Sequence, residues 1–228
     1  LDPYDERYYR DLMHEIPPME HVERRTSLDL HHAITPPTSR FAVDSARLFQ
    51  RVQPLPGLPG LFVLQPADMV LHGVVHLLQD GEFSGGQRDL LDFHELLVHF
   101  GADPAFWPGL VQRARELGLQ RSLGQALAQA RRLFDTPVPA ALQAEVAALQ
   151  PPGLRSALMQ HLLTAALRPS HPDCDSPATG LARWLLYVRS HWLRMPWYQI
   201  LPHLARKAWM RAAGRIPAQG DAPAAPGL

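Results

Sequence analysis

The sequence of 228 residues contains one cysteine, one lysine and no net charge. Cys174 alone excludes a disulfide framework and a zinc site built from four thiolates. Because 22 basic residues balance 22 acidic ones, the overall charge does not indicate nucleic acid or an acidic membrane as a partner. No apolar run reaches the roughly 20 residues that a transmembrane helix needs, and the first residues lack the pattern of a signal peptide. These absences predict a cytoplasmic protein.

The residues that are present predict an ordered globular chain of one or two domains, because 46% of them are hydrophobic. Polar and apolar residues alternate over Thr26–Ile34, which is typical of a half-buried strand. Leu61–Leu64 is a second, short strand candidate. Short helices are expected around Arg7–His14 and over Ser39–Arg51, the latter with Phe41, Ala42, Ser45, Leu48 and Phe49 on one face.

The rest of the chain has the periodicity of helices, punctuated by proline and glycine. The predicted helices are Pro66–Gln79, Gln87–Phe100, Pro104–Leu117, Leu119–Phe134, Pro139–Leu149, Leu154–Leu167, Ala178–Arg194 and Pro196–Ala213. A disordered Pro/Ala/Gly tail is expected after them. The predicted fold class is therefore α+β and mostly helical, with a small sheet followed by a bundle of about seven or eight helices.

Asp29 and His31 are the most informative polar residues, because strand alternation places both on one face. An exposed edge-strand face explains this pattern as well as a metal site does. Carboxylates flanked by apolar residues recur on strands of two-metal sites, where Mg²⁺ prefers oxygen ligands.

Two helices carry further candidates. Asp68, His72 and His76 follow one another at helical spacing, which allows zinc chelation, although packing and hydrogen bonding are favoured. Arg88 and Asp92 are spaced to form an ion pair on the next helix, where a solvated polar face is the favoured interpretation. The aromatic and basic stretch Arg183–Tyr198 is interpreted as a packed helix in preference to a nucleic-acid or membrane surface.

Several segments in a fixed order resemble a known family. They are Leu28-Asp-Leu-His-His32, Leu64-Gln-Pro-Ala-Asp-Met-Val-Leu-His72 with His76, Arg88-Asp-Leu-Leu-Asp-Phe-His94, Leu110–Leu119, Pro137-Val-Pro139 and Val188–Pro196. Together they resemble the uncharacterised nucleotidyltransferase family of bacteria over about residues 20–210. In that family a small nucleotidyltransferase domain precedes a helical region.

The resemblance implies transfer of a nucleoside monophosphate from a nucleoside triphosphate to an unknown hydroxyl-bearing acceptor with Mg²⁺. It implies residues 1–64 as the C-terminal remnant of the catalytic domain, 65–213 as the helical domain and 214–228 as the tail. Asp29 is similar to the third metal-binding acid of the family, and His31, His72, His76, Arg88 and Asp92 are candidates for substrate binding.

The family's Gly-Ser turn and Asp-x-Asp strand have no counterpart in this sequence. They are expected before Leu1, about 50–80 residues ahead of Asp29 by domain size, so the chain alone is expected to be an inactive fragment. Two other functions stay open: a non-catalytic helical interaction module, and a metallohydrolase that uses His72, His76, Asp89 and Asp92. The upstream coding sequence distinguishes the enzyme from the module.

Overall fold

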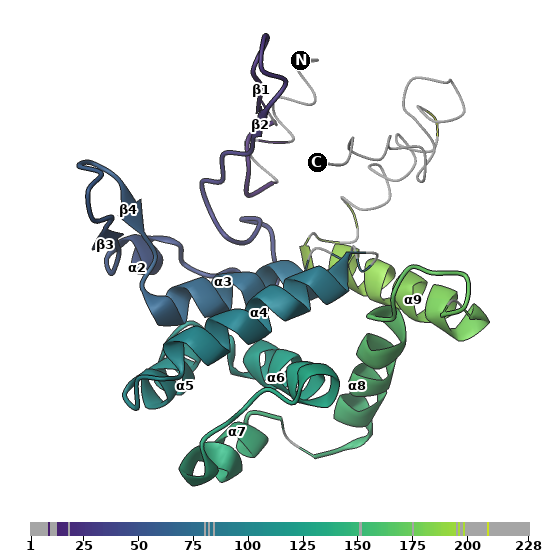
Figure 1. Cartoon of the computed structure of the whole chain (residues 1–228). Coiled ribbons are helices and arrows are strands. Elements are labelled where there is room, and N and C mark those ends of the chain that lie inside the picture. Colours follow the sequence, from purple (N-terminus) through teal and green to yellow (C-terminus); the bar gives the residue numbers. More distant parts are fainter. Residues whose placement is uncertain are drawn as a thin grey trace.

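Figure 1 shows the fold of the chain in a computed structural model. It describes residues 13–17, 19–79, 85–150, 152–174 and 176–194, together with the single residues 9, 81, 83, 196, 198 and 209. Within this part the chain forms eight α-helices and two antiparallel two-stranded hairpins. This confirms the predicted α+β, mostly helical class. No helix of the described part is both long and apolar enough to cross a bilayer.

Seven helices make up the bundle and follow the predicted order closely. They are α3 (Pro66–Gln79), α4 (Gly86–Phe100), α5 (Phe106–Glu116), α6 (Gln120–Phe134), α7 (Gln143–Ala148), α8 (Leu154–Ala166) and α9 (Pro177–Arg194), with a 3₁₀ turn, η1 (Ala140–Leu142), before α7. Pro66 occupies the first position of α3, where its missing N–H costs nothing. Most of the predicted helix over residues 196–213, the tail and most of the predicted helix over residues 7–14 lie outside the described residues.

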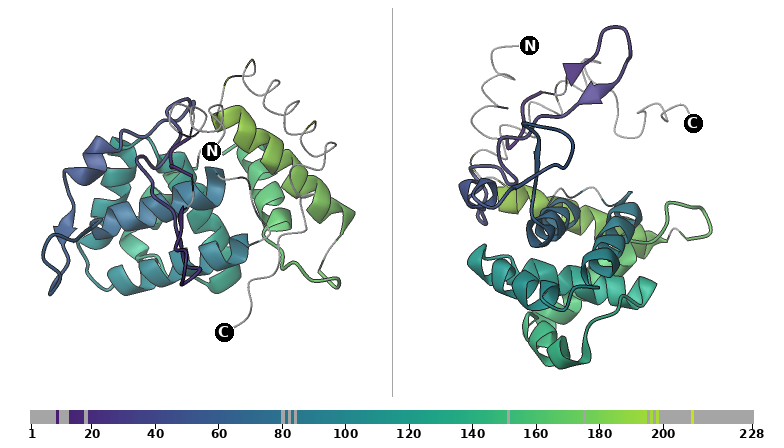
Figure 2. Two further views of the ribbon diagram at one scale, coloured as in Figure 1. Left: turned by 90° about the horizontal axis from the view of Figure 1, so that it is seen from above. Right: turned by 60° about the vertical axis from the view of Figure 1, so that its left-hand side comes forward.

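Helix α3 is the centre of the core. It contacts α4, α5, α6 and α9, and Figure 1 shows α3 and α4 side by side with α5 and α6 below them. Figure 2 gives two further views of the same arrangement. Val70, Leu71 and Val74 on α3 are completely buried. Burial of one such side chain contributes about 1.5–3 kcal/mol, so the apolar face of α3 is a major source of the bundle's stability.

Arginines of α9 cap the C-terminal ends of two neighbouring helices. Arg189 Nη1 donates to the Leu78 carbonyl at 3.3 Å, and Arg194 Nε donates to the Gln79 carbonyl at 2.8 Å. Both acceptors belong to the last turn of α3, where carbonyls lack partners within the helix. Arg183 donates in the same way to the Ala166 carbonyl at the end of α8, at 3.0 Å. Desolvation by burial lowers the pKa of Arg189.

The first hairpin is much shorter than the predicted strand and is not half-buried. Strand β1 (Met19–Glu20) pairs with β2 (Ser27–Leu28), and an isolated bridge joins Glu15 to His31. Leu28 is 59% exposed and Leu30 is 51% exposed. The half-burial prediction was wrong because, in the described part, no helix packs on this two-stranded ribbon. The second hairpin pairs β3 (Gln53–Pro54) with β4 (Phe62–Val63). Strand β4 lies inside the second predicted strand, whereas β3 was not predicted.

The predicted helix over Ser39–Arg51 is also largely wrong. Only α2 (Ala46–Phe49) is helical, and Leu48 alone is buried in it. Phe49 is 62% exposed, because a helix of one turn presents a single side chain to the core. Phe41 is 55% exposed and lies in the loop before α2. The preceding segment is a loop in which the Val43 N–H donates to Thr35 Oγ1 at 2.9 Å.

The loop between the first hairpin and α2 is tied to the end of α9. Thr38 Oγ1 donates to the Arg194 carbonyl at 2.7 Å, and the Arg40 N–H donates to the Leu193 carbonyl at 2.8 Å. The Arg40 guanidinium also lies 4.4 Å from the ring centroid of Trp192, in a cation–π contact. The N-terminal part of the chain is thus anchored to its last described helix.

Candidate functional site

Asp29 lies on the first hairpin, directly after β2, and its side chain is exposed. Main-chain bonds hold it in extended geometry, because Leu28 pairs with Met19 and the Leu30 carbonyl accepts the Ile16 N–H at 2.9 Å. Among the described residues, no ion pair or hydrogen bond involves the Asp29 carboxylate. Its oxygens are therefore accessible to a ligand from solvent.

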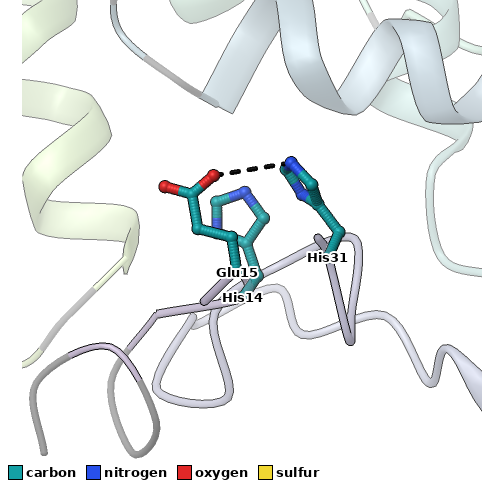
Figure 3. Close-up of side chains that lie close together, drawn as sticks. All are labelled: His14, Glu15 and His31. Atoms are coloured by element: carbon teal, nitrogen blue, oxygen red, sulfur yellow. Dashed lines mark ion pairs between the residues drawn. The ribbon is translucent and has the colours of Figure 1, made fainter. Parts of the chain in front are cut away.

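Three ligand-bearing side chains gather at the base of the same hairpin (Figure 3). His14, Glu15 and His31 each offer one ligand atom, and these atoms lie within 4.8 Å of one another. His31 Nε2 is 3.4 Å from Glu15 Oε2, and the His14 and His31 rings lie 5.1 Å apart between centroids. His14 is buried, whereas Glu15 is half-buried and His31 is more exposed. In the described part this is the only such group of three.

The candidates on α3 and α4 are brought together only in part. His76 Nδ1 lies 3.8 Å from Asp89 Oδ2 across the two helices, and His72 is half-buried one turn before His76. Arg88 and Asp92 are both exposed, and within the described residues no ion pair joins them. The four residues of the metallohydrolase hypothesis, His72, His76, Asp89 and Asp92, do not form a group of three ligand atoms within reach of one ion.

Asp68 is a structural residue, which agrees with the hydrogen-bonding interpretation of its helix. Its buried carboxylate binds Arg113 of α5 in a bidentate pair, with Nε–Oδ1 at 2.7 Å and Nη2–Oδ2 at 3.0 Å. Gln65 Nε2 donates to the same carboxylate at 3.1 Å. Arg113 Nη2 also donates to the Arg47 carbonyl at 2.8 Å. The pair joins α3, α5 and α2.

Glu116 extends this network to the surface. It accepts a hydrogen bond from Arg113 Nη1 at 3.1 Å, and Arg51 Nη2 lies 3.3 Å from the same oxygen. The hydrogen bond from Arg113 lowers the pKa of Glu116, and the hydrogen bond to Asp68 raises the pKa of Arg113. The raised pKa of Arg113 and the lowered pKa of Glu116 both favour the charged forms of this pair, so the network acts as a structural link between these elements.

The sequence prediction named His31 but missed its two neighbours, His14 and Glu15, as well as Arg113. His14 and Glu15 lie 16 or 17 positions before His31, and no periodic pattern connects them. The signal that could have found them is the hairpin itself, because antiparallel pairing across a turn near residues 21–26 places Glu15 opposite His31. The first strand of that hairpin was not predicted, because the two prolines before Met19 argue against a strand at this point.

Comparison with known proteins gives one match. A family model described as an uncharacterised nucleotidyltransferase matches residues 1–135. The matched residues include both hairpins, α2 and helices α3 to α6. No curated protein and no solved structure matches the chain.

Proposed function

The chain belongs to the uncharacterised nucleotidyltransferase family, and we propose that its protein transfers a nucleoside monophosphate from a nucleoside triphosphate to a hydroxyl-bearing acceptor. The observation that supports a role for Asp29 is its exposed carboxylate, on the segment directly after β2 and within the matched residues. Cytoplasmic location, where nucleoside triphosphates are available, is part of the proposal.

The proposed reaction is a displacement at the α-phosphorus of the triphosphate. The acceptor oxygen forms a bond to that phosphorus, the bond from the α-phosphorus to the bridging oxygen of pyrophosphate breaks, and the acceptor proton leaves to solvent. Reactions of this kind depend mainly on positioning and on neutralisation of the phosphate charge. Divalent metal ions, proposed to be Mg²⁺, supply that neutralisation when bound.

The described residues fit such a metal centre only in part. Asp29 is a hard, accessible oxygen ligand of the kind that Mg²⁺ prefers. A two-metal centre needs several carboxylates, and among the described residues Asp29 belongs to no group of three metal-ligating side chains. We therefore assign Asp29 as one metal ligand and derive no catalytic step through the ions.

The other candidates are proposed as substrate contacts. Arg88 is exposed in the first turn of α4 and offers positive charge to phosphate. His31, His72, His76 and Asp92 are proposed to orient the acceptor or the nucleotide by hydrogen bonding. In this proposal residues 1–64 belong to the catalytic domain and residues 65–213 to the helical domain.

The test compares the wild type with Asp29→Asn, which keeps the shape of an exposed side chain and removes its charge. Binding of each nucleoside triphosphate to the 228-residue chain is measured by calorimetry with and without Mg²⁺. Transfer is measured with the protein expressed from its complete gene, as release of pyrophosphate from labelled nucleoside triphosphate. Glu23→Gln is the matched control, because Glu23 is an exposed carboxylate in the turn of the same hairpin.

We expect Asp29→Asn to lower the transfer rate on the order of 100-fold, by loss of charge stabilisation of the kind seen when one stabilising group is removed. Glu23→Gln should transfer at the wild-type rate. Equal rates for wild type and Asp29→Asn would remove Asp29 from the site. Failure of every nucleoside triphosphate to bind or to release pyrophosphate would refute the proposed function as a whole.

A further inference from the structure

We propose that His14, Glu15 and His31 form a binding site for a transition-metal ion of the zinc type, distinct from the magnesium ligand Asp29. Figure 3 shows the three side chains on two neighbouring segments at the base of the hairpin, with the ion pair between Glu15 and His31 drawn. The proposal goes beyond nucleotidyl transfer, because it concerns a different metal and, apart from His31, different residues.

The spacing of the ligand atoms fits a tetrahedral ion. Zinc binds histidine nitrogen and carboxylate oxygen at about 2.0–2.2 Å, which sets the distance between two ligands at roughly 3.3–3.6 Å. His31 Nε2 and Glu15 Oε2 are already 3.4 Å apart, and every pair of ligand atoms in the group lies within 4.8 Å. No pair has to close by more than about 1.5 Å for all three to reach one ion.

The main chain fixes the positions from which these side chains project. Glu15 and His31 are direct partners in the antiparallel bridge, and residues opposed in this way place their side chains on the same face. The His14 carbonyl accepts the backbone N–H groups of His32 and Ala33, at 2.9 and 3.2 Å. These bonds hold the two segments in register before any ion binds.

The ligand set selects the metal. Two imidazoles and one carboxylate suit zinc and its neighbours in the transition series, whereas Mg²⁺ prefers ligands that are all oxygen. Three protein ligands leave a fourth position for water or another ligand. Without metal, His31 Nε2 and Glu15 Oε2 already lie 3.4 Å apart.

A bound ion would cross-link the two ends of the hairpin. It would join residues 14 and 15 to residue 31, which lies two positions beyond Asp29. The ion would therefore restrict the motion of the segment that carries the Asp29 carboxylate. The described part of the hairpin has little apolar burial of its own, since every residue from 21 to 30 is exposed. A metal ion would therefore supply a constraint that packing does not.

The experiment is a titration of the metal-stripped 228-residue chain with Zn²⁺, and with Co²⁺ as a coloured substitute, in the presence of excess Mg²⁺. We expect one tight equivalent and the visible absorption of Co²⁺ in a four- or five-coordinate site. His31→Ala and Glu15→Gln should each weaken binding by about 100-fold or more, since even outer-shell changes around a metal cost 10–100-fold. Both side chains are accessible enough for the variants to fold, which thermal melts without metal will verify.

His32→Ala is the matched control, because this exposed histidine adjoins His31 but lies outside the group. It should bind Zn²⁺ as the wild type does. Wild-type affinity in both His31→Ala and Glu15→Gln would overturn the proposal, as would loss of the tight equivalent in His72→Ala or His76→Ala instead. No nucleotide is present in the titration, so its outcome is independent of the proposed transferase activity.

Discussion

Replacement of Arg113 by methionine tests the buried ion pair that joins α3 to α5. The Arg113 and Asp68 side chains are 4% and 0% exposed, and their contact is bidentate. Methionine fills much of the space of the arginine stem but leaves the Asp68 charge buried with Gln65 as its remaining polar partner. Breaking a buried pair in this way costs about 3–5 kcal/mol of unfolding free energy.

Arg115→Met is the control on the same helix. Arg115 binds Glu145 at 2.8 Å, but its side chain is 47% exposed. Exposed pairs contribute only about 0.2–1 kcal/mol, although the distance is almost the same as that of the buried pair. The comparison therefore sets a buried, bidentate ion pair against an exposed ion pair with a single close contact.

The assay is equilibrium unfolding in urea at pH 7, followed by circular dichroism. We expect a much lower midpoint for Arg113→Met than for Arg115→Met. The double variant Asp68→Leu with Arg113→Met should be more stable than Arg113→Met alone, because it removes the uncompensated charge. Equal midpoints for Arg113→Met and Arg115→Met would refute this account of the network. So would a double variant whose loss of unfolding free energy equals the sum of the losses in Asp68→Leu and Arg113→Met.

Two further predictions concern the same helices and the loop after α3. The pKa of Glu116 is lowered, so its contribution to stability is present above the ordinary pKa of 4.5 and is lost as pH falls through the folded-state pKa. When unfolding is measured from pH 7 downward, the free energy of unfolding of Glu116→Gln should therefore fall less steeply with pH than that of the wild type. The same pH dependence in both proteins would contradict this. Gly81→Ala should lower the free energy of unfolding more than Gly118→Ala, because both glycines have positive φ but only a Cβ at Gly81 would collide with the Ser190 side chain. Strain alone is worth about 1–2 kcal/mol, so thermal melts that rank Gly118→Ala as the more destabilised would refute the close contact.

Most of the helical bundle could be predicted from sequence because its signals are local. Helix α3 begins and ends at the predicted residues, and the prediction for α4 differs by one residue at its start. A long apolar stripe repeats its information over several turns, so one ambiguous residue changes little. The strands have no such redundancy. Each described strand is two residues long, and its existence depends on a partner that no local pattern identifies.

The candidate site shows the same difference between local signals, which the sequence reveals, and contacts with distant residues, which it does not. Alternation along the strand drew attention to Asp29 and His31, but it could not supply the partners that decide what each residue does. His31 meets Glu15 across the hairpin, and His76 meets Asp89 across two helices. Asp68 finds Arg113 at a separation of 45 residues. Each of these contacts is made by tertiary structure, which is why sequence spacing alone left a metal role and a packing role open.

The anchoring of the hairpin gives the helical region a role in placing Asp29. The segment after the hairpin bonds to the last turn of α9 through Thr38 and Arg40, and α9 in turn caps α3 through Arg189 and Arg194. Helix α9 lies beyond the residues that the family model matches. Since hydrogen bonds are directional, we expect α9 to fix the direction in which the N-terminal segment leaves the helical bundle. Substitutions at the end of α9 should therefore shift the segment that carries Asp29 even where they leave the helical bundle folded.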